Sequence, residues 1–192
     1  MSINDYVIEK QLETKINIAD LDTLNVKVKP NAKACLFFET KGKDISKTQI
    51  NVELEENSSC ELYGFFKNIK KQTNIVTNVI HKGSQSKCNQ DFRFVNKKGA
   101  SSFEGKITIP KDVVKCESHM LNKNILLDDE SDAFAKPELD INNDDVICTH
   151  GCTIGALDED HLFYLQSRGY TLDEATEILI EAFAHIRTQE HI

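Results

Sequence analysis

Two stretches of this chain carry the same pattern, and this repeat constrains the fold more than any other feature. In both, Asn-Val is followed by an apolar residue, then by Asn with a small residue, and then by Leu with an aromatic residue; the copies are 24–37 and 50–63. A fainter third copy puts Ile80 at the position of Val28 and Leu54, and Gly83-Ser84 at the turn. Self-similarity with such a period is typical of solenoid proteins.

The apolar positions alternate within each copy, as Val26 and Val28 do in the first, and alternation is typical of strands. An Asn at the turn tolerates left-handed backbone torsions. Short strands joined by such turns wind into a β-helix, although an antiparallel meander of similar hairpins fits the same pattern. Further strand-like runs cover 73–80, 91–95, 102–109 and 117–127, and the period is expected to shorten after Gly99-Ala100.

The charge of the chain limits its partners. The formal net charge is −8. An acidic surface repels phosphates, so we expect neither nucleic acid nor an anionic membrane as the main partner. No apolar run approaches the length that spans a bilayer.

The six cysteines are scattered along the chain, and only the last two are close together. The first residues carry no basic and apolar secretion signal, so a disulfide framework is not expected and a reducing cytoplasm is the predicted location. Cys88 falls at the position of Leu36 and Leu62 in the repeat and is predicted to lie in the core. His81 is predicted at the surface or in a turn.

The C-terminal part changes to helical patterning. Asp158, Glu159 and Asp160 begin a first helix, where carboxylates face unpaired backbone N–H groups. Its apolar side is assigned to Leu162, Phe163 and Leu165, and Gly169 ends it. A capping box of Thr171 and Glu174 begins a second helix, whose apolar positions are Ala175, Ile178, Leu179, Ala182, Phe183 and Ile186.

These patterns divide the chain into three parts. Residues 1–23 form an N-terminal arm or a first strand, residues 24–156 form the β-helix core, and residues 157–192 form the C-terminal helical segment. The fold class is therefore mainly β, with a helical hairpin appended to it.

One cluster of residues is suited to metal chemistry. Cys148, His150 and Cys152 are spaced two apart, so all three side chains point the same way if the run is extended. Thiolates and a neutral imidazole are ligands for iron or zinc. Three ligands on one strand cannot close a tetrahedral site, and a fourth must come from a neighbouring coil or a second subunit. The alternative is that these residues simply stack on a β coil, with His150 hydrogen-bonded.

Motifs of enzymes with their own active centre are not found in the sequence. Gly83-Ser84 and Gly99-Ala100 are isolated turn glycines rather than a phosphate-binding loop, and the sequence contains no G-x-S-x-G. We therefore predict neither an enzyme nor a protein that binds ATP directly.

The region from residue 124 onward resembles the C-terminal part of the SufB/SufD family, the scaffold subunits of Suf iron–sulfur cluster assembly. The resemblance rests on Asn124–Leu127, Lys136–Leu139, Asp144–Gly151, Thr153, Gly155, Leu157–Glu159, Leu162–Leu165, Ser167–Gly169 and Ala182–Ala184. It implies a right-handed parallel β-helix and decides against the meander. It also implies work on a transient, nascent iron–sulfur cluster.

The resemblance assigns roles to two of the three candidate ligands. In SufD-type subunits the Cys-x-His-Gly segment lies at the interface with a SufB-type partner, and its histidine is implicated in building the cluster. That carries to His150 and Cys148. SufD-type relatives usually have Ala at the position of Cys152, so the assignment of Cys152 as a ligand rests on geometry only. The cysteine and glutamate of SufB-type subunits, expected near Asn122 and in 150–152, are not present here, so the motif is SufD-like.

The resemblance also implies partners. The C-terminal helices, Leu157 to Ile186, would dock a SufC-like ABC-type ATPase. A SufB-like subunit or a second copy of this chain would pair through the β-helix; the family's longer members carry an N-terminal region without a counterpart here. Two other interpretations stay open, namely a β-helix module that only recruits the ATPase and a zinc-binding hydrolase.

Overall fold

The computed structural model describes residues 2–19, 21–40 and 47–184. Twelve strands and two helices follow one another along these ranges. The strands are β1 (Ile3–Ile8), β2 (Gln11–Asn17), β3 (Thr23–Val28), β4 (Lys33–Glu39), β5 (Thr48–Leu54), β6 (Ser59–Ile69), β7 (Gln72–His81), β8 (Lys87–Lys97), β9 (Ala100–Ile109), β10 (Cys116–Leu126), β11 (Asp132–Ile141) and β12 (Val146–Gly155). The helices are α1 (Glu159–Ser167) and α2 (Leu172–Ala184).

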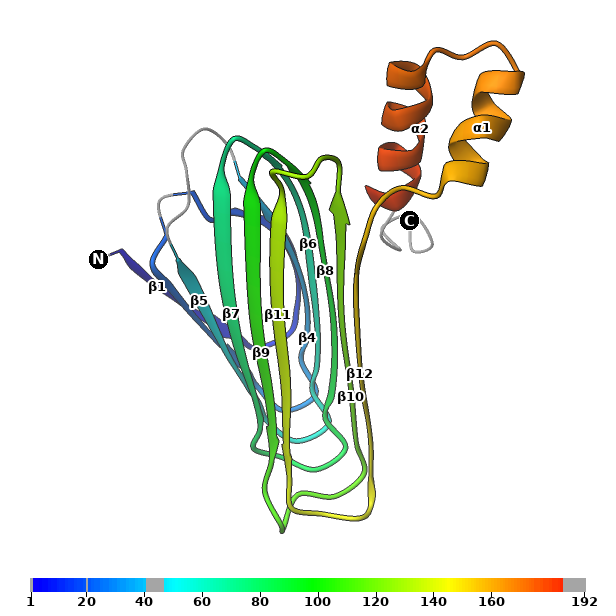
Figure 1. Cartoon of the computed structure of the whole chain (residues 1–192). Coiled ribbons are helices and arrows are strands. Elements are labelled where there is room, and N and C mark those ends of the chain that lie inside the picture. Colours follow the sequence, from blue (N-terminus) through cyan, green and yellow to red (C-terminus); the bar gives the residue numbers. More distant parts are fainter. Residues whose placement is uncertain (1, 20, 41–46, 185–192) are drawn as a thin grey trace.

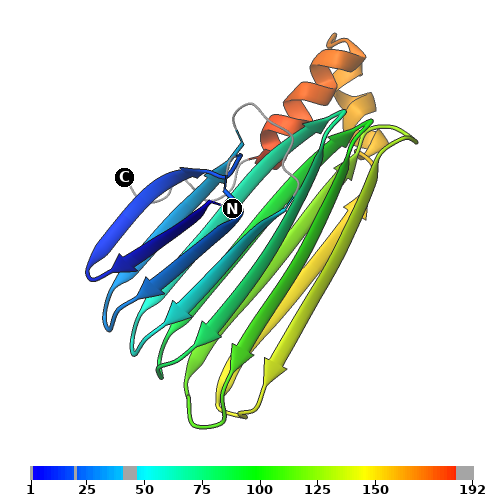
Figure 2. The same ribbon diagram turned by 90° about the vertical axis from the view of Figure 1, so that its left-hand side faces the viewer.

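The strands form two six-stranded sheets, and the chain passes from one to the other after every strand. One sheet has the order β1-β3-β5-β7-β9-β11, and the second has the order β12-β10-β8-β6-β4-β2. Every pairing between strands is parallel. The result is a flattened β-solenoid with α1 and α2 beside one end (Figures 1 and 2). The predicted parallel β-helix with a helical hairpin is confirmed, and the antiparallel meander is excluded.

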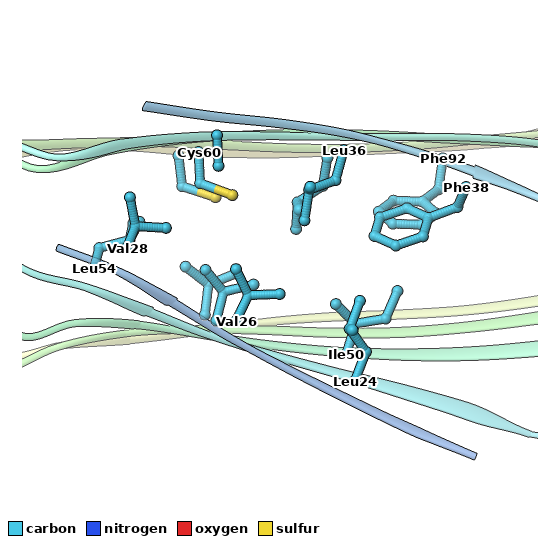
Figure 3. Close-up of a cluster of buried hydrophobic side chains, with 14 of the residues drawn as sticks. Leu24, Val26, Val28, Leu36, Phe38, Ile50, Leu54, Cys60 and Phe92 are labelled. Carbon is cyan, nitrogen blue, oxygen red and sulfur yellow. The ribbon is translucent and has the colours of Figure 1, made fainter. Parts of the chain in front are cut away.

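The core consists of straight rows of side chains that run across the strands. Parallel pairing in register places equivalent residues of successive coils beside one another, about 4.8 Å apart. One row contains Leu24 and Ile50, and a facing row contains Leu36 and Leu62. Figure 3 shows such rows from the two sheets meeting in the interior. Burial of these rows supplies the main stabilisation of the solenoid.

The period of the sequence repeat describes the β3–β5 and β4–β6 pairings only, because the first coil is shorter and the later coils are longer. Leu24 pairs with Ile50, as the repeat predicts, but Ile50 pairs with Thr77 rather than with Val76, the position that the same period would reach. Cys88 pairs with Ser118, well beyond the position expected from that period. The predicted shortening of the period is therefore wrong. The period lengthens because β6 to β12 have ten or eleven residues, whereas β1 to β5 have six or seven.

The lengthening coil shifts the third copy of the repeat. His81, not Ile80, occupies the row of Val28 and Leu54. Gln85, with a positive φ of 60°, takes the turn position of Asn31 and Asn57, rather than Gly83-Ser84. Cys88 is shifted in the same way, because it pairs with Cys60 rather than with Leu62. It still lies in the core, as predicted.

Two further expectations concern positions that the structure places inside the solenoid. The first expectation is that residues 1–23 form an arm or a first strand. Within this range, residues 3–17 contain two strands, β1 and β2, which pair with β3 and β4 as a first coil. His81 is fully buried, so its prediction as a surface or turn residue is wrong. Its Nδ1 lies 2.7 Å from Ser86 Oγ. The one-residue shift of the coil turned its side chain inward.

Both ends of α1 and the start of α2 are marked by the residues that the sequence predicts. Asp158 caps α1, because its carboxylate accepts from the backbone N–H groups of Asp160 and His161. Gly169 has a φ of 97°, which suits glycine after a helix end. The capping box is present, with Thr171 N donating to Glu174 Oε2 at 2.8 Å. Residues 185–192, including Ile186 of the predicted apolar stripe, lie outside the described residues.

Candidate functional site

Strand β12 carries all three predicted ligands and ends three interior rows. In the β10–β12 pairing, Cys148 lies beside Ser118, His150 beside Met120, and Cys152 beside Asn122, so each is the next residue of the same row. All three preceding residues are buried inside the solenoid. The alternation along β12 therefore points the three candidate ligands to the interior side of the sheet.

The candidate ligands are nevertheless accessible, because the described solenoid ends at this coil. Cys148 is half-buried and packs against the core, whereas His150 and Cys152 are exposed. On the opposite sheet, β11 is also an edge strand and is only partly buried. Side chains that would be core in any earlier coil are thus presented at an open end of the molecule.

Burial affects the chemistry of the two thiols. Partial desolvation raises the pKa of Cys148, and the nearby Cys116 adds to this effect. Desolvation also raises the pKa of Cys152, whose Sγ lies 3.8 Å from Asn122 Oδ1. Both groups are therefore protonated thiols at neutral pH. They become metal ligands only when a bound cation displaces the proton.

The three residues do not form a metal site by themselves. Neighbours on one face of a strand are about 6.6 Å apart, whereas two ligands of one ion must come much closer. Among the described residues, no three His, Cys, Asp or Glu side chains converge closely enough to hold an ion. Each candidate ligand therefore needs groups from outside this part of the chain to complete a coordination shell.

The backbone of β12 has one edge to which no described strand pairs. At its other edge it pairs with β10. An exposed edge presents a row of N–H and C=O groups that another strand can pair with. Further strand pairing at this edge would place new side chains beside His150 and Cys152.

The other cysteines belong to earlier coils, and His119 faces outward from the neighbouring strand β10. Cys60, Cys88 and Cys116 are buried, and all six cysteines are free thiols. Burial and the neighbouring Glu61 carboxylate raise the pKa of Cys35 to about 12, so this thiol is a poor metal ligand. His119 lies on the outer face of β10, with Nδ1 2.7 Å from Thr149 Oγ1.

The hairpin displays apolar side chains that the sequence pattern misplaced. Phe163 was assigned to the apolar side of α1 but is 72% exposed, whereas Leu162 and Leu165 are partly buried. The signal was available, because Leu162 and Leu165 are three apart and share a face that Phe163 cannot share. The exposed apolar residues of the hairpin, here called the hairpin patch, are Phe163, Tyr164, Tyr170 and Leu172.

The fold and the site define a class of protein, a parallel β-solenoid that presents a Cys/His set on an unpaired edge strand. A family profile described as "SUF system FeS cluster assembly, SufBD core domain" matches residues 6–183. The chain belongs to this SufB/SufD family of iron–sulfur cluster assembly proteins.

Individual relatives agree with this assignment. The chain is 39% identical over 90 residues to iron–sulfur cluster assembly protein SufD of Escherichia coli, covering 47% of this chain and 21% of that protein. It is 42% identical over 82 residues to the SufBD family protein slr0076 of Synechocystis, covering 43% of this chain and 18% of the relative. It is 30% identical over 141 residues to SufD of Plasmodium falciparum, covering 71% of this chain and 10% of that protein.

The matched region spans only about a fifth of the length of the first two relatives. Within the described residues, no helix has the length and apolar character needed to cross a membrane.

Proposed function

We propose that this chain is a non-catalytic scaffold subunit on which an iron–sulfur cluster is assembled, with His150 and Cys148 contributing to the nascent cluster at a subunit interface. One observation carries the proposal: these potential ligands end interior rows on β12, a strand with one edge to which no described strand pairs. Family membership supports the role in cluster assembly. The cluster is cargo rather than a resident cofactor.

Each side chain would have a distinct task. The neutral imidazole of His150 would offer a ring nitrogen to iron without losing a proton. The thiol of Cys148 would lose its proton on binding, and its partial burial would keep the bound sulfur away from bulk water. Cys152, which is exposed, would contribute in the same way.

The missing ligands would come from a second chain that pairs with β12. Both a SufB-like subunit and a second copy of this chain satisfy the requirement, since either would add a strand to the unpaired edge. Residues of that strand would then lie beside the row ends of β12. A site shared in this way opens or closes with the contact between the chains.

A SufC-like ATPase is the proposed second partner, and the hairpin patch is its proposed docking site. Four large apolar side chains project from a short hairpin, and such patches on a soluble surface mark interaction sites. ATP would be bound and hydrolysed by this partner. Its dimerisation would strain the subunit contact and expose the nascent cluster.

Anaerobic reconstitution with Fe²⁺ and sulfide tests the scaffold role. We expect the visible chromophore of the wild type to fall by about tenfold or more in His150→Ala and Cys148→Ser, as for the loss of a metal ligand or its support. His119→Ala on the neighbouring strand and Cys35→Ser are matched controls and should keep the chromophore. An equal chromophore in all variants would instead favour a module that only recruits the ATPase.

A further inference from the structure

The helical hairpin is attached to the solenoid at two places. The chain itself connects Gly155 at the end of β12 to α1 through three residues. At the other attachment, α2 packs on the outer face of β8 and β10, where Ile180 contacts an apolar cluster with Val95 and Ile125. Figure 1 shows the connection rising from β12 to α1, with α2 lying back toward the β body.

The second attachment is small. Among the described residues, α1 has no buried side chain, and α2 has only Ala175 and Ile180. Segments with few buried apolar contacts open locally at low free energy. A specific polar contact can therefore decide whether the hairpin stays in place.

That contact is made by Arg93 of β8. Its Nη1 donates to the Phe183 carbonyl oxygen at 2.6 Å, and its guanidinium carbon lies 5.7 Å from the centroid of the Phe183 ring. Its Nε and Nη2 donate to the two carboxylate oxygens of Asp91 at 2.9 and 2.6 Å. The side chains of Arg93 and Asp91 are only 14% and 12% exposed.

The chemistry of the contact makes it strong. A guanidinium that donates to a carbonyl oxygen forms a charge-assisted hydrogen bond, which is stronger than a bond between neutral groups. Arg93 supplies this charge from the sheet to the last described turn of α2. The two-pronged pair with Asp91 fixes the guanidinium plane in advance. Asp91, Arg93 and the Phe183 carbonyl are here called the hairpin latch.

The latch lies in the same sheet as the candidate ligands. Arg93 pairs with Lys123 of β10, which pairs with Thr153 of β12. Two strand spacings, about 10 Å, therefore separate the latch from β12. Leu121, the neighbour of Asp91, lies against Gly151, where a Cβ atom would be 3.2 Å from Leu121 Cδ1.

We propose that Arg93 is a positioning residue that couples the hairpin to β12. The hairpin is covalently connected to the end of β12, and the latch binds it to β8. The two attachments and the sheet between them therefore form a closed loop. A force on the hairpin is then transmitted to both β12 and β8. With the latch intact, the strand that carries His150 and Cys152 is held in place. Its use by an ATPase rests on the proposed function, but the coupling itself does not.

The test uses the isolated chain, so it is independent of any ATPase. Hydrogen exchange reports the hairpin, and the rate of Cys152 alkylation by N-ethylmaleimide, mapped by mass spectrometry, reports β12. In Arg93→Met we expect hairpin exchange to accelerate by about tenfold or more, as for loss of a charged hydrogen bond. Cys152 alkylation should accelerate by about threefold as the edge strand loosens.

Matched variants separate this role from general destabilisation. Lys67→Met removes an exposed ion pair, 2.8 Å long, between Lys67 of β6 and Glu177 of α2. It should change both rates by less than about twofold. If Arg93→Met folds poorly because it leaves the buried Asp91 carboxylate unpaired, the double variant Asp91→Asn with Arg93→Met removes that charge. The double variant should show the same faster hairpin exchange and faster Cys152 alkylation. Exchange in β7 and β9 should match the wild type.

Two results would overturn the proposal. Hairpin exchange in the Arg93 variants equal to that of Lys67→Met would show that the latch does not hold the hairpin. Faster hairpin exchange with unchanged Cys152 alkylation would show that hairpin position is not transmitted to β12. Either result leaves the reconstitution test of the scaffold role unaffected.

Discussion

Single residues inside a solenoid inherit their environment from the row in which they lie. His81 occupies a row with the aliphatic side chains of Val28 and Leu54, and burial there lowers its pKa to about 4. Its Nε2 has no hydrogen-bond partner among the described residues. A polar ring in an apolar row is a net cost to stability, which increases when the ring must be charged.

The pH dependence of stability should show this cost. Between about pH 6.5 and 4 the unfolded histidine binds a proton that the folded one refuses, so stability decreases as the pH falls through this window, by about 3 kcal/mol in total. His81→Leu should remove this part of the dependence, measured by urea unfolding at pH 7 and pH 5. His161→Gln, at an exposed site, is the control. Equal pH slopes in wild type and His81→Leu would contradict the burial of the neutral ring.

The raised thiol pKa values predict a second pH dependence. Because burial keeps Cys148 and Cys152 protonated, Fe²⁺ binding must release protons, and affinity should increase with pH by about tenfold per unit for each thiol bound. Anaerobic titrations between pH 6.5 and 8.5 measure this slope. Cys148→Ser should reduce it, and Cys35→Ser should not. A slope of zero in the wild type would mean that neither thiol is a ligand.

At the scale of elements, local signals predicted the helices better than the strands. Asp158, Gly169 and the Thr171–Glu174 box fix the helix ends through contacts within a few residues, and these ends are confirmed. In the third coil, which face of the strand each side chain points to depends on the segment from β6 to β7. This segment is one residue longer than the equivalent segment from β4 to β5, and it puts His81 in the place of Ile80. No residue near position 80 records that addition, so the local pattern could not reveal it.

The hairpin patch predicts a defined binding defect. Phe163 is the most exposed of its large apolar residues, at 72%, so Phe163→Asp should leave thermal stability unchanged. Its affinity for a SufC-like ATPase should decrease by about 30-fold or more, as for a central aromatic contact. Isothermal titration calorimetry measures the affinity. His161→Asp on the same helix is a control for charge, and equal loss in both variants would argue against a specific role of the aromatic ring.

At the scale of the whole molecule, the proposed function depends on where the coils of the described solenoid end. The motif Cys-x-His-x-Cys and the resemblance identified the strand, and alternation predicted that its three side chains face one way, as the register with β10 shows. The sequence could not reveal that these positions end rows that contain Ser118, Met120 and Asn122, because the rows join residues a whole coil apart in the chain. The latch joins residues even further apart, Arg93 and Phe183.

The central claim is that iron binds where β12 meets another chain, with His150 as one of the ligands. Sedimentation velocity under anaerobic conditions, with iron detected across the boundary, tests it most directly. We predict that iron sediments with an assembly of two chains, this one with itself or with a SufB-like subunit, and that His150→Ala releases the iron. Iron that sediments with the single chain and remains bound in His150→Ala would contradict the claim.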